Sequence, residues 1–304
     1  MSTVPQRGKS TSMRGRSEGP VQAQCEILSN RRVGLYRQLT IVAPEIADRA
    51  SPGQFVSIAV HGKGTMLRRP FSIAGVSRYG PWSGTLDVVF NVVGAGTEWL
   101  ADRVKQDGLD VVGPLGRPFP LPRQQATCLL VGGGYGAAPL VYLAAALQDQ
   151  GHRVHLLVGA ATGELVYNAI EVKRVVSSAR FTTEDGSFGL HGKVTDALPD
   201  FIDSAQPDAL YACGSMGMLR AVAAHARRRK LPCQVAVEEL MGCGTGVCMT
   251  CVIPYRRKDG IINIRACLEG PVLDAKRIVW DGIGADLNNM RMDPPSAPEG
   301  GAVA

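Results

Sequence analysis

Long apolar runs are missing from this sequence. It contains no stretch of about 18 or more consecutive apolar residues, which excludes a membrane-spanning helix. The first 20 residues carry several basic side chains but no apolar segment, so they lack the core of a secretory signal. No nucleic-acid-binding motif is recognisable, and the formal net charge of +6 is modest for 304 residues. We therefore expect neither membrane insertion nor a nucleic-acid partner.

Histidine is scarce, with 5 residues, whereas cysteine is plentiful, with 8. Half of the cysteines fall between Cys243 and Cys267, and no histidine lies among them. In a chain without a secretory signal, this clustering favours metal binding over disulfides. The same argument predicts a cytoplasmic protein.

The texture of the sequence changes along the chain and predicts a multi-domain β plus α/β protein. Short β-patterned runs separated by glycine and proline indicate a small antiparallel barrel, and alternating strands and helices then indicate a parallel sheet. A small cysteine-rich module follows, and both ends of the chain read as disordered, the first one basic. The predicted boundaries are 1–20 for the basic tail, 21–122 for the barrel, 123–231 for the α/β domain, 232–284 for the cysteine module and 285–304 for the second tail.

The cysteine module has the spacing C-x4-C-x2-C, followed by fifteen residues and a fourth cysteine. This arrangement is typical of plant-type 2Fe–2S sites, and it predicts four cluster ligands, Cys243, Cys248, Cys251 and Cys267. Glycines at 242, 244 and 246 allow the loop to curl tightly and to aim backbone N–H groups at the sulfurs. A structural zinc site is the alternative, although one knuckle without histidine fits it less well.

A glycine-rich turn joins the first strand of the α/β domain to its first helix. In "LLVGGGYGAAPL" it contains Gly132, Gly133, Gly134 and Gly136, which would bring a pyrophosphate against the helix N-terminus. We therefore expect NAD(H) to bind there.

Acidic residues follow a later strand of the same domain. Glu184 and Asp185 lie in "FTTEDGSFG", and carboxylates near a ribose tolerate a 2′-hydroxyl but repel a 2′-phosphate. This favours NADH over NADPH.

The segment "ACGSMGM" ends the last predicted strand of this domain. Ligands bind at the carboxyl ends of strands in open α/β sheets, so Cys213 and Gly214 are predicted near the nicotinamide. Cys213 is a candidate catalytic residue on this interpretation. A buried core thiol is the equally weighted alternative.

The barrel carries two signals for a flavin. The first, "LRRPFSIAG", contains Arg69, Pro70, Phe71 and Ser72. Arg69 would pair with a phosphate and Phe71 would pack on the cofactor. Ser72, the second candidate catalytic residue, would hydrogen-bond the ring near its reducible nitrogen.

The second signal, "NVVGAGTEWL", places Gly94, Gly96 and Thr97 at a helix N-terminus, where an anion is favoured. Each signal alone could be a surface turn or a helix cap, but their order along the chain favours FAD binding.

Residues 21–283 resemble the electron-transfer subunits of class 1B dihydroorotate dehydrogenase, within the ferredoxin–NADP reductase superfamily. The resemblance rests on "LRRPFSI", "VVGAGTEWL", "GPLGRPF", "VGGGYGAAPL", "EDGSFG", "ACGSMGML", "EELMGCGTGVCMTC" and "ACLEGPV". It implies one FAD, one 2Fe–2S cluster and NADH. It also implies a separate FMN-containing catalytic subunit that oxidises dihydroorotate to orotate for pyrimidine biosynthesis, joined with this chain in a heterotetramer. The sequence departs from the family motif at Phe71, where an aliphatic residue is frequent.

The expected function is therefore electron transfer between that partner and NAD. A flavin exchanges electron pairs with NADH and single electrons with an iron–sulfur cluster, which predicts that FAD lies between the two. Reductase subunits of hydrogenases, sulfide dehydrogenases and electron-bifurcating transhydrogenases are alternatives with the same architecture. An alternative of another class is a zinc-stabilised binding protein without redox activity.

Overall fold

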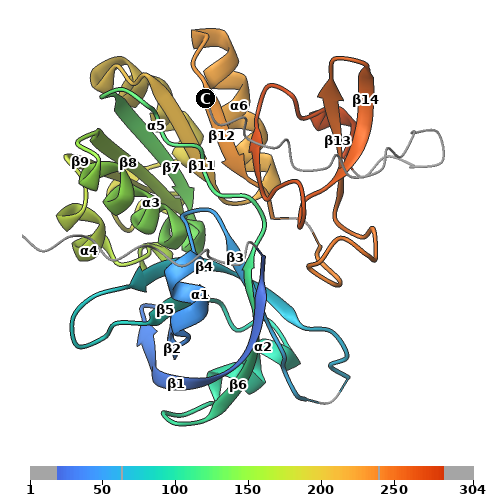
Figure 1. Cartoon of the computed structure of the whole chain (residues 1–304). Helices are drawn as coiled ribbons and strands as arrows, with labels where there is room; N and C mark the ends of the chain where they lie inside the picture. Colours follow the sequence, from blue (N-terminus) through green and yellow to red (C-terminus); the bar gives the residue numbers. More distant parts are fainter. Residues whose placement is uncertain (1–18, 63, 239, 284–304) are drawn as a thin grey trace, which may run out of the picture.

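The computed structural model describes residues 19–62, 64–238 and 240–283 (Figure 1). Apart from residues 19 and 20, the two predicted tails, 1–20 and 285–304, lie outside these ranges. Within the described ranges, no helix has the length and apolar character needed to cross a bilayer.

The N-terminal part is a closed barrel of six antiparallel strands in the order β1–β2–β5–β4–β3–β6. The alternating burial of β6 is typical, because Leu109, Val111 and Leu115 point inward while their neighbours are more exposed. The strands are β1 (Val21–Val33), β2 (Tyr36–Val42), β3 (Phe55–Ile58), β4 (Arg69–Ser77), β5 (Thr85–Phe90) and β6 (Gly108–Leu115), and two short helices, α1 (Pro44–Arg49) and α2 (Ala95–Ala101), accompany them.

The second part is a seven-stranded sheet in the order β10–β9–β8–β7–β11–β12–β15. All neighbours are parallel except β12 and β15, which pair antiparallel. Its strands are β7 (Thr127–Gly133), β8 (Arg153–Ala160), β9 (Ser178–Thr183), β10 (Leu190–His191), β11 (Ala209–Cys213), β12 (Cys233–Ala236) and β15 (Val272–Asp274).

Helices cover both faces of this sheet, which explains the apolar character of its central strands. Alternate residues of β7 enter different cores: Leu130 packs with α3 (Ala137–Asp149) and Val172 of α4 (Ala169–Arg174). Leu129 packs with α5 (Val194–Ala205) and α6 (Met216–Arg229). The predicted fold class, an antiparallel barrel followed by a parallel-sheet domain and a cluster module, is confirmed.

The cysteine segment contributes to two units. Its hairpin, β13 (Val252–Arg257) and β14 (Gly260–Arg265), stands beside the sheet at the upper right of Figure 1. Its flanks, β12 and β15, form the last two strands of the seven-stranded sheet. The cysteine loop is therefore fixed to the sheet at both of its ends.

Candidate functional site

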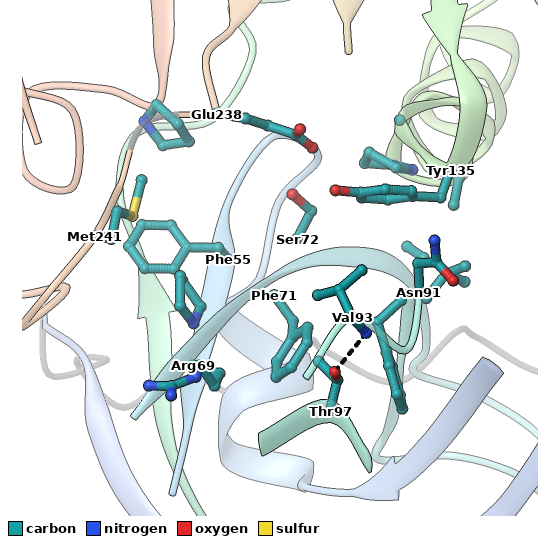
Figure 2. Close-up of a pocket in the computed structure, with 18 of the residues that line it drawn as sticks. Phe55, Arg69, Phe71, Ser72, Asn91, Val93, Thr97, Tyr135, Glu238 and Met241 are labelled. Atoms are coloured by element: carbon teal, nitrogen blue, oxygen red, sulfur yellow. Dashed lines mark hydrogen bonds between the residues drawn. The ribbon is translucent and has the colours of Figure 1, made fainter. Parts of the chain in front are cut away.

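A cavity of about 380 Å³ lies where the barrel, the glycine-rich turn and the start of the cysteine segment meet (Figure 2). Strand β4 lines it with all four residues of the predicted flavin motif, Arg69, Pro70, Phe71 and Ser72. Thr97 of α2 lines it as well. The structure thus brings both predicted flavin signals to one cavity.

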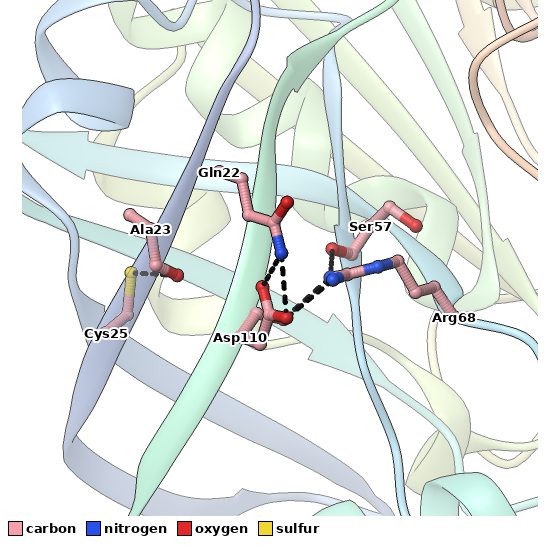
Figure 3. Close-up of polar contacts among 6 residues, drawn as sticks. All are labelled: Gln22, Ala23, Cys25, Ser57, Arg68 and Asp110. Carbon is pink, nitrogen blue, oxygen red and sulfur yellow. Dashed lines mark hydrogen bonds and ion pairs between the residues drawn. The ribbon is translucent and has the colours of Figure 1, made fainter.

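The two neighbouring arginines before β4 have different environments. Arg68 donates a hydrogen bond from Nη2 to Asp110 Oδ2 at 2.6 Å, and Gln22 donates to the same carboxylate (Figure 3). Arg69 donates to the backbone carbonyl of Leu67, and no described carboxylate lies within ion-pair distance of it. Arg69, whose charge is not neutralised by a described acid, is therefore the arginine suited to a phosphate.

The second signal lies directly beside Arg69. A Cβ built on Gly96 would lie 3.1 Å from Arg69 Nε, so a larger residue would displace the guanidinium. The Thr97 hydroxyl accepts hydrogen bonds from the backbone N–H of Val93 at 2.9 Å and of Gly94 at 3.2 Å. These contacts hold the turn, so Thr97 shapes the cavity wall.

Phe71 lies mostly inside the barrel. Its ring packs on Phe90 with centroids 5.4 Å apart, and only 8% of the residue is exposed. The expected packing of Phe71 on the cofactor is therefore limited to the edge that reaches the cavity.

A groove of about 760 Å³ crosses the carboxyl ends of the parallel strands, the place where nucleotides bind in such sheets. Gly133 and Gly134 line it. Gly132 and Gly136 allow close packing instead: a Cβ on Gly132 would lie 2.9 Å from Ala137 Cα, and one on Gly136 only 2.7 Å from the carbonyl oxygen of Cys213.

Of the two predicted acidic residues, only Glu184 lines the groove. Glu184 lines it together with Lys193. Asp185 accepts hydrogen bonds from Ser187 Oγ at 2.6 Å and Ser187 N at 3.0 Å. These bonds from Ser187 lower the pKa of the Asp185 carboxyl. Asp185 therefore stabilises the turn that it shares with Ser187.

Cys213 is 1% exposed and lies beneath Gly136 in the core of the sheet. Burial, together with the charge of Glu238, raises the pKa of its thiol well above the ordinary value. The following residue, Gly214, has a φ of +155°, a conformation that suits glycine. This placement favours the core-thiol interpretation of Cys213.

Three residues that the sequence analysis did not single out, Asn91, Tyr135 and Glu238, line both the cavity and the groove. Figure 2 shows the Tyr135 hydroxyl, the Glu238 carboxyl and the Ser72 hydroxyl pointing toward one another. Burial raises the pKa of Tyr135 to about 12. Burial of the carboxyl also raises the pKa of Glu238, against the opposing effect of a hydrogen bond with the Tyr135 hydroxyl, although the residue as a whole is exposed. In the sequence, Tyr135 is signalled only by "GYG" after a strand and Glu238 only as an acid two residues after β12, and Asn91 carries no signal beyond following β5.

The four predicted cluster ligands are all free thiols, and the hydrogen bonds associate them in two pairs. Cys243 donates its backbone N–H to Cys248 Sγ at 3.3 Å, and Cys267 donates its backbone N–H to Cys251 Sγ at 3.4 Å. The first pair is at the surface, with Cys248 exposed, and the second pair is buried.

Backbone donors converge on one sulfur of the outer pair. The N–H groups of Thr245, Val247 and Cys248 point at Cys243 Sγ from 3.3, 3.3 and 3.4 Å. Burial alone would raise the pKa of Cys243, but these donors outweigh it and lower the pKa to about 6. The loop therefore stabilises a thiolate, as the glycine spacing predicted.

The inner pair is linked through the backbone N–H of Cys267, which donates to Cys251 Sγ at 3.4 Å. Contact with Cys267 lowers the pKa of Cys251 to about 6, and the same contact raises the pKa of Cys267. A deprotonated sulfur is the form that binds metal.

This donor set fits a binuclear cluster, in which each iron takes two thiolates. A tetrahedral zinc site requires four donors around one ion, whereas these hydrogen bonds associate the sulfurs two by two.

Comparison with known proteins agrees with this geometry. Residues 238–279 match the family model of the iron–sulfur cluster binding domain of dihydroorotate dehydrogenase B. A protein of Desulforamulus reducens named dihydroorotate dehydrogenase B (NAD(+)), electron transfer subunit, is 35% identical over 240 residues, which are 79% of this chain and 90% of that protein. A protein of Enterococcus faecalis with the same name is 35% identical over 247 residues, 80% of this chain and 92% of that one.

One solved structure is also similar in sequence. It is described as an NADH-dependent reduced ferredoxin-NADP oxidoreductase that gives insight into flavin-based electron bifurcation. The two chains are 31% identical, with a TM-score of 0.75 and coverage of 88% of this chain and 94% of that one.

Proposed function

We propose that this chain carries electrons between the FMN-containing catalytic subunit of a dihydroorotate dehydrogenase and NAD. The reason is that the chain belongs to the family of dihydroorotate dehydrogenase B electron transfer subunits. The catalytic subunit oxidises dihydroorotate in pyrimidine biosynthesis, and this chain joins it in a heterotetramer. A cytoplasmic location is part of the same proposal and rests on the cysteine chemistry of the sequence. When bound, the flavin exchanges a hydride with NADH and single electrons with an iron–sulfur cluster.

The cavity offers FAD two sets of contacts, one for a phosphate and one for the flavin ring. Arg69 neutralises a phosphate next to the turn of Gly94, Gly96 and Thr97, because its guanidinium lies against Gly96 and has no described acidic partner. Ser72 lies at the other end with Tyr135 and Glu238 (Figure 2), where its hydroxyl would hydrogen-bond the flavin ring near its reducible nitrogen.

The groove holds NAD(H) across the ends of the strands. Gly133 and Gly134 bring the backbone close to the pyrophosphate, and Glu184 disfavours a 2′-phosphate. Gly214 gives the chain its turn after β11 beside the nicotinamide position.

The cysteine loop would hold the 2Fe–2S cluster with the surface thiols of Cys243 and Cys248 and the buried thiols of Cys251 and Cys267. The N–H donors to Cys243 offset the negative charge that the cluster brings to the loop.

One observation carries the proposal: the three sites adjoin one another. Tyr135 and Glu238 line both the flavin cavity and the nucleotide groove, and Met241, which lines the cavity, stands two residues before Cys243. A hydride donor and a one-electron acceptor therefore reach the same cavity from two sides.

Purification of the chain from its native cells tests the proposal. The protein should be yellow-brown, contain FAD and about two irons per chain, and co-purify with an FMN-containing dihydroorotate dehydrogenase. A colourless protein that contains zinc would support the non-redox alternative and overturn the proposal.

A second candidate function is a subunit of an electron-bifurcating transhydrogenase. It is favoured by the 31% identity to the ferredoxin-NADP oxidoreductase chain. The two candidates share the cofactors and differ in the partner, so the identity of the co-purified protein decides between them.

A further inference from the structure

An ion pair flanks the inner cysteine pair. Arg265 is the last residue of β14, Glu269 follows four residues later, and Cys267 lies between them. Arg265 Nη2 donates to Glu269 Oε1 at 2.9 Å, and the backbone N–H of Arg265 donates to Glu269 Oε2 at 2.8 Å. Both side chains are largely buried, with exposed fractions of 14% and 12%.

Arg265 also reaches the opposite side of the cysteine site. Its Nη1 donates to the carbonyl oxygen of Gly246 at 3.1 Å, and Gly246 lies in the loop between Cys243 and Cys248. A Cβ built on Gly246 would lie 3.7 Å from the same Nη1. The guanidinium therefore bridges from Glu269, next to the inner cysteine pair, to the loop that carries the outer pair.

Positive and negative side chains in this position have opposite effects on the reduction of a cluster. One-electron reduction adds one negative charge to the cluster and requires no proton. A nearby cation favours the reduced form and a nearby anion opposes it, and the effect is strong where water is largely excluded.

We propose that Arg265 and Glu269 set the reduction potential of the cluster as a balanced pair, with Arg265 raising it and Glu269 lowering it. This inference rests on the proposed function, because it assumes that the four cysteines hold the cluster. Both residues are positioning residues, since they act through the field at the cluster rather than as its ligands.

The test is an EPR-monitored redox titration of the whole purified chain and its variants. Arg265→Gln should shift the cluster potential to a more negative value, by about tenfold in the one-electron equilibrium or about 59 mV. Glu269→Gln should shift it by a similar amount in the positive direction. The double variant should return close to the parental potential.

Matched controls separate charge from fold. Arg103 and Asp107 form an ion pair with the same i,i+4 spacing in the barrel, with a 3.6 Å separation and exposed fractions of 30% and 32%. Arg103→Gln and Asp107→Asn should leave the potential unchanged. Arg265→Lys keeps the charge but loses the fork that holds Gly246, so it should stay near the parental potential.

The outcomes decide the inference. Shifts of opposite sign in the two single variants, with compensation in the double variant, support it. Shifts of the same sign, or an equal shift in Arg265→Lys, would mean that the pair only braces the loop and would overturn it. If Arg265→Gln loses iron, Glu269→Gln alone decides through the sign of its shift. A parental protein without iron would overturn the proposed function and this inference together.

Discussion

The ring of Phe55 lies against Gly244. A Cβ built on Gly244 would come within 3.6 Å of Phe55 Cε2. Phe55 also lines the flavin cavity and is only 3% exposed, whereas Gly244 belongs to the loop between Cys243 and Cys248. A single buried side chain therefore touches both the flavin cavity and the cysteine loop.

Phe55→Leu should slow electron transfer between flavin and cluster. The smaller side chain leaves a gap in the wall that the two sites share, while the residues that contact the nucleotide are unchanged. Stopped-flow absorbance should show flavin reduction by NADH near the parental rate and a slower bleaching of the cluster. Truncation to alanine is less informative, because it costs about 3–5 kcal/mol of stability.

Phe119→Leu is the matched control. Phe119 is also 3% exposed and packs on Tyr211, with ring centroids 5.7 Å apart. It should leave both rates unchanged. Equal slowing of both steps in Phe55→Leu would show that the substitution acts through general destabilisation.

Cys248→Ser should remove the cluster and leave FAD bound. A serine hydroxyl is a poor replacement for a thiolate ligand. The barrel that provides most of the flavin cavity is a closed sheet that contains none of the four cysteines. Iron analysis and the flavin spectrum of the purified variant measure the two occupancies.

Cys128→Ser supplies the comparison, because Cys128 is buried in the sheet and belongs to no cysteine pair. It should keep its iron. Full iron occupancy in Cys248→Ser would show that the ligand assignment is wrong.

The sequence predicted the architecture because each part carries a local pattern. Barrel strands such as β6 alternate, the central sheet strands β7, β8 and β11 are largely apolar, and the cysteines have a diagnostic spacing. Strands β12 and β15 were not foreseen in the sheet, because three or four residues are too few to show a period.

The junction between cavity and groove was also missed. Tyr135 and Glu238 are about a hundred residues apart in sequence, and only the docking of the barrel on the sheet brings both to the flavin. The sequence motif indicates Arg69, but the reason that Arg68 is unsuited, its ion pair with Asp110, appears only in the structure.

Arg69→Ala should purify with little FAD. The lost charge-assisted contact is worth about 1.5–3 kcal/mol, which corresponds to roughly a tenfold to hundredfold weaker affinity. NADH oxidation should fall with the flavin content, while the iron–sulfur absorbance persists because the cysteine loop is not altered. Normal FAD content in this variant would show that another group binds the phosphate.

Glu184→Gln should reduce the preference for NADH over NADPH, because Glu184 lines the groove and its charge opposes a 2′-phosphate. Asp185→Asn is the matched control, since that carboxylate is engaged with Ser187. Steady-state kcat/KM with both nucleotides measures the ratio. If only the Asp185 variant changes it, the assignment of the two acids is reversed.

The raised pKa of Glu238 predicts a pH dependence of stability with a definite sign. In the unfolded chain an ordinary glutamate loses its proton near pH 4.3, at about its reference pKa. The folded protein keeps that proton to higher pH, so it binds more protons than the unfolded chain in the window above this value. The stabilisation that this group contributes is therefore complete in acid and declines as the pH rises through the folded pKa.

Glu238→Gln removes the ionisation, so its thermal midpoint should exceed the parental one by an amount that grows from acidic to neutral pH. Glu26→Gln, an exposed position on β1, should follow the parental curve. A constant or shrinking difference between the Glu238 variant and the parent would mean that this carboxyl is already ionised in acid, held by the Tyr135 hydroxyl.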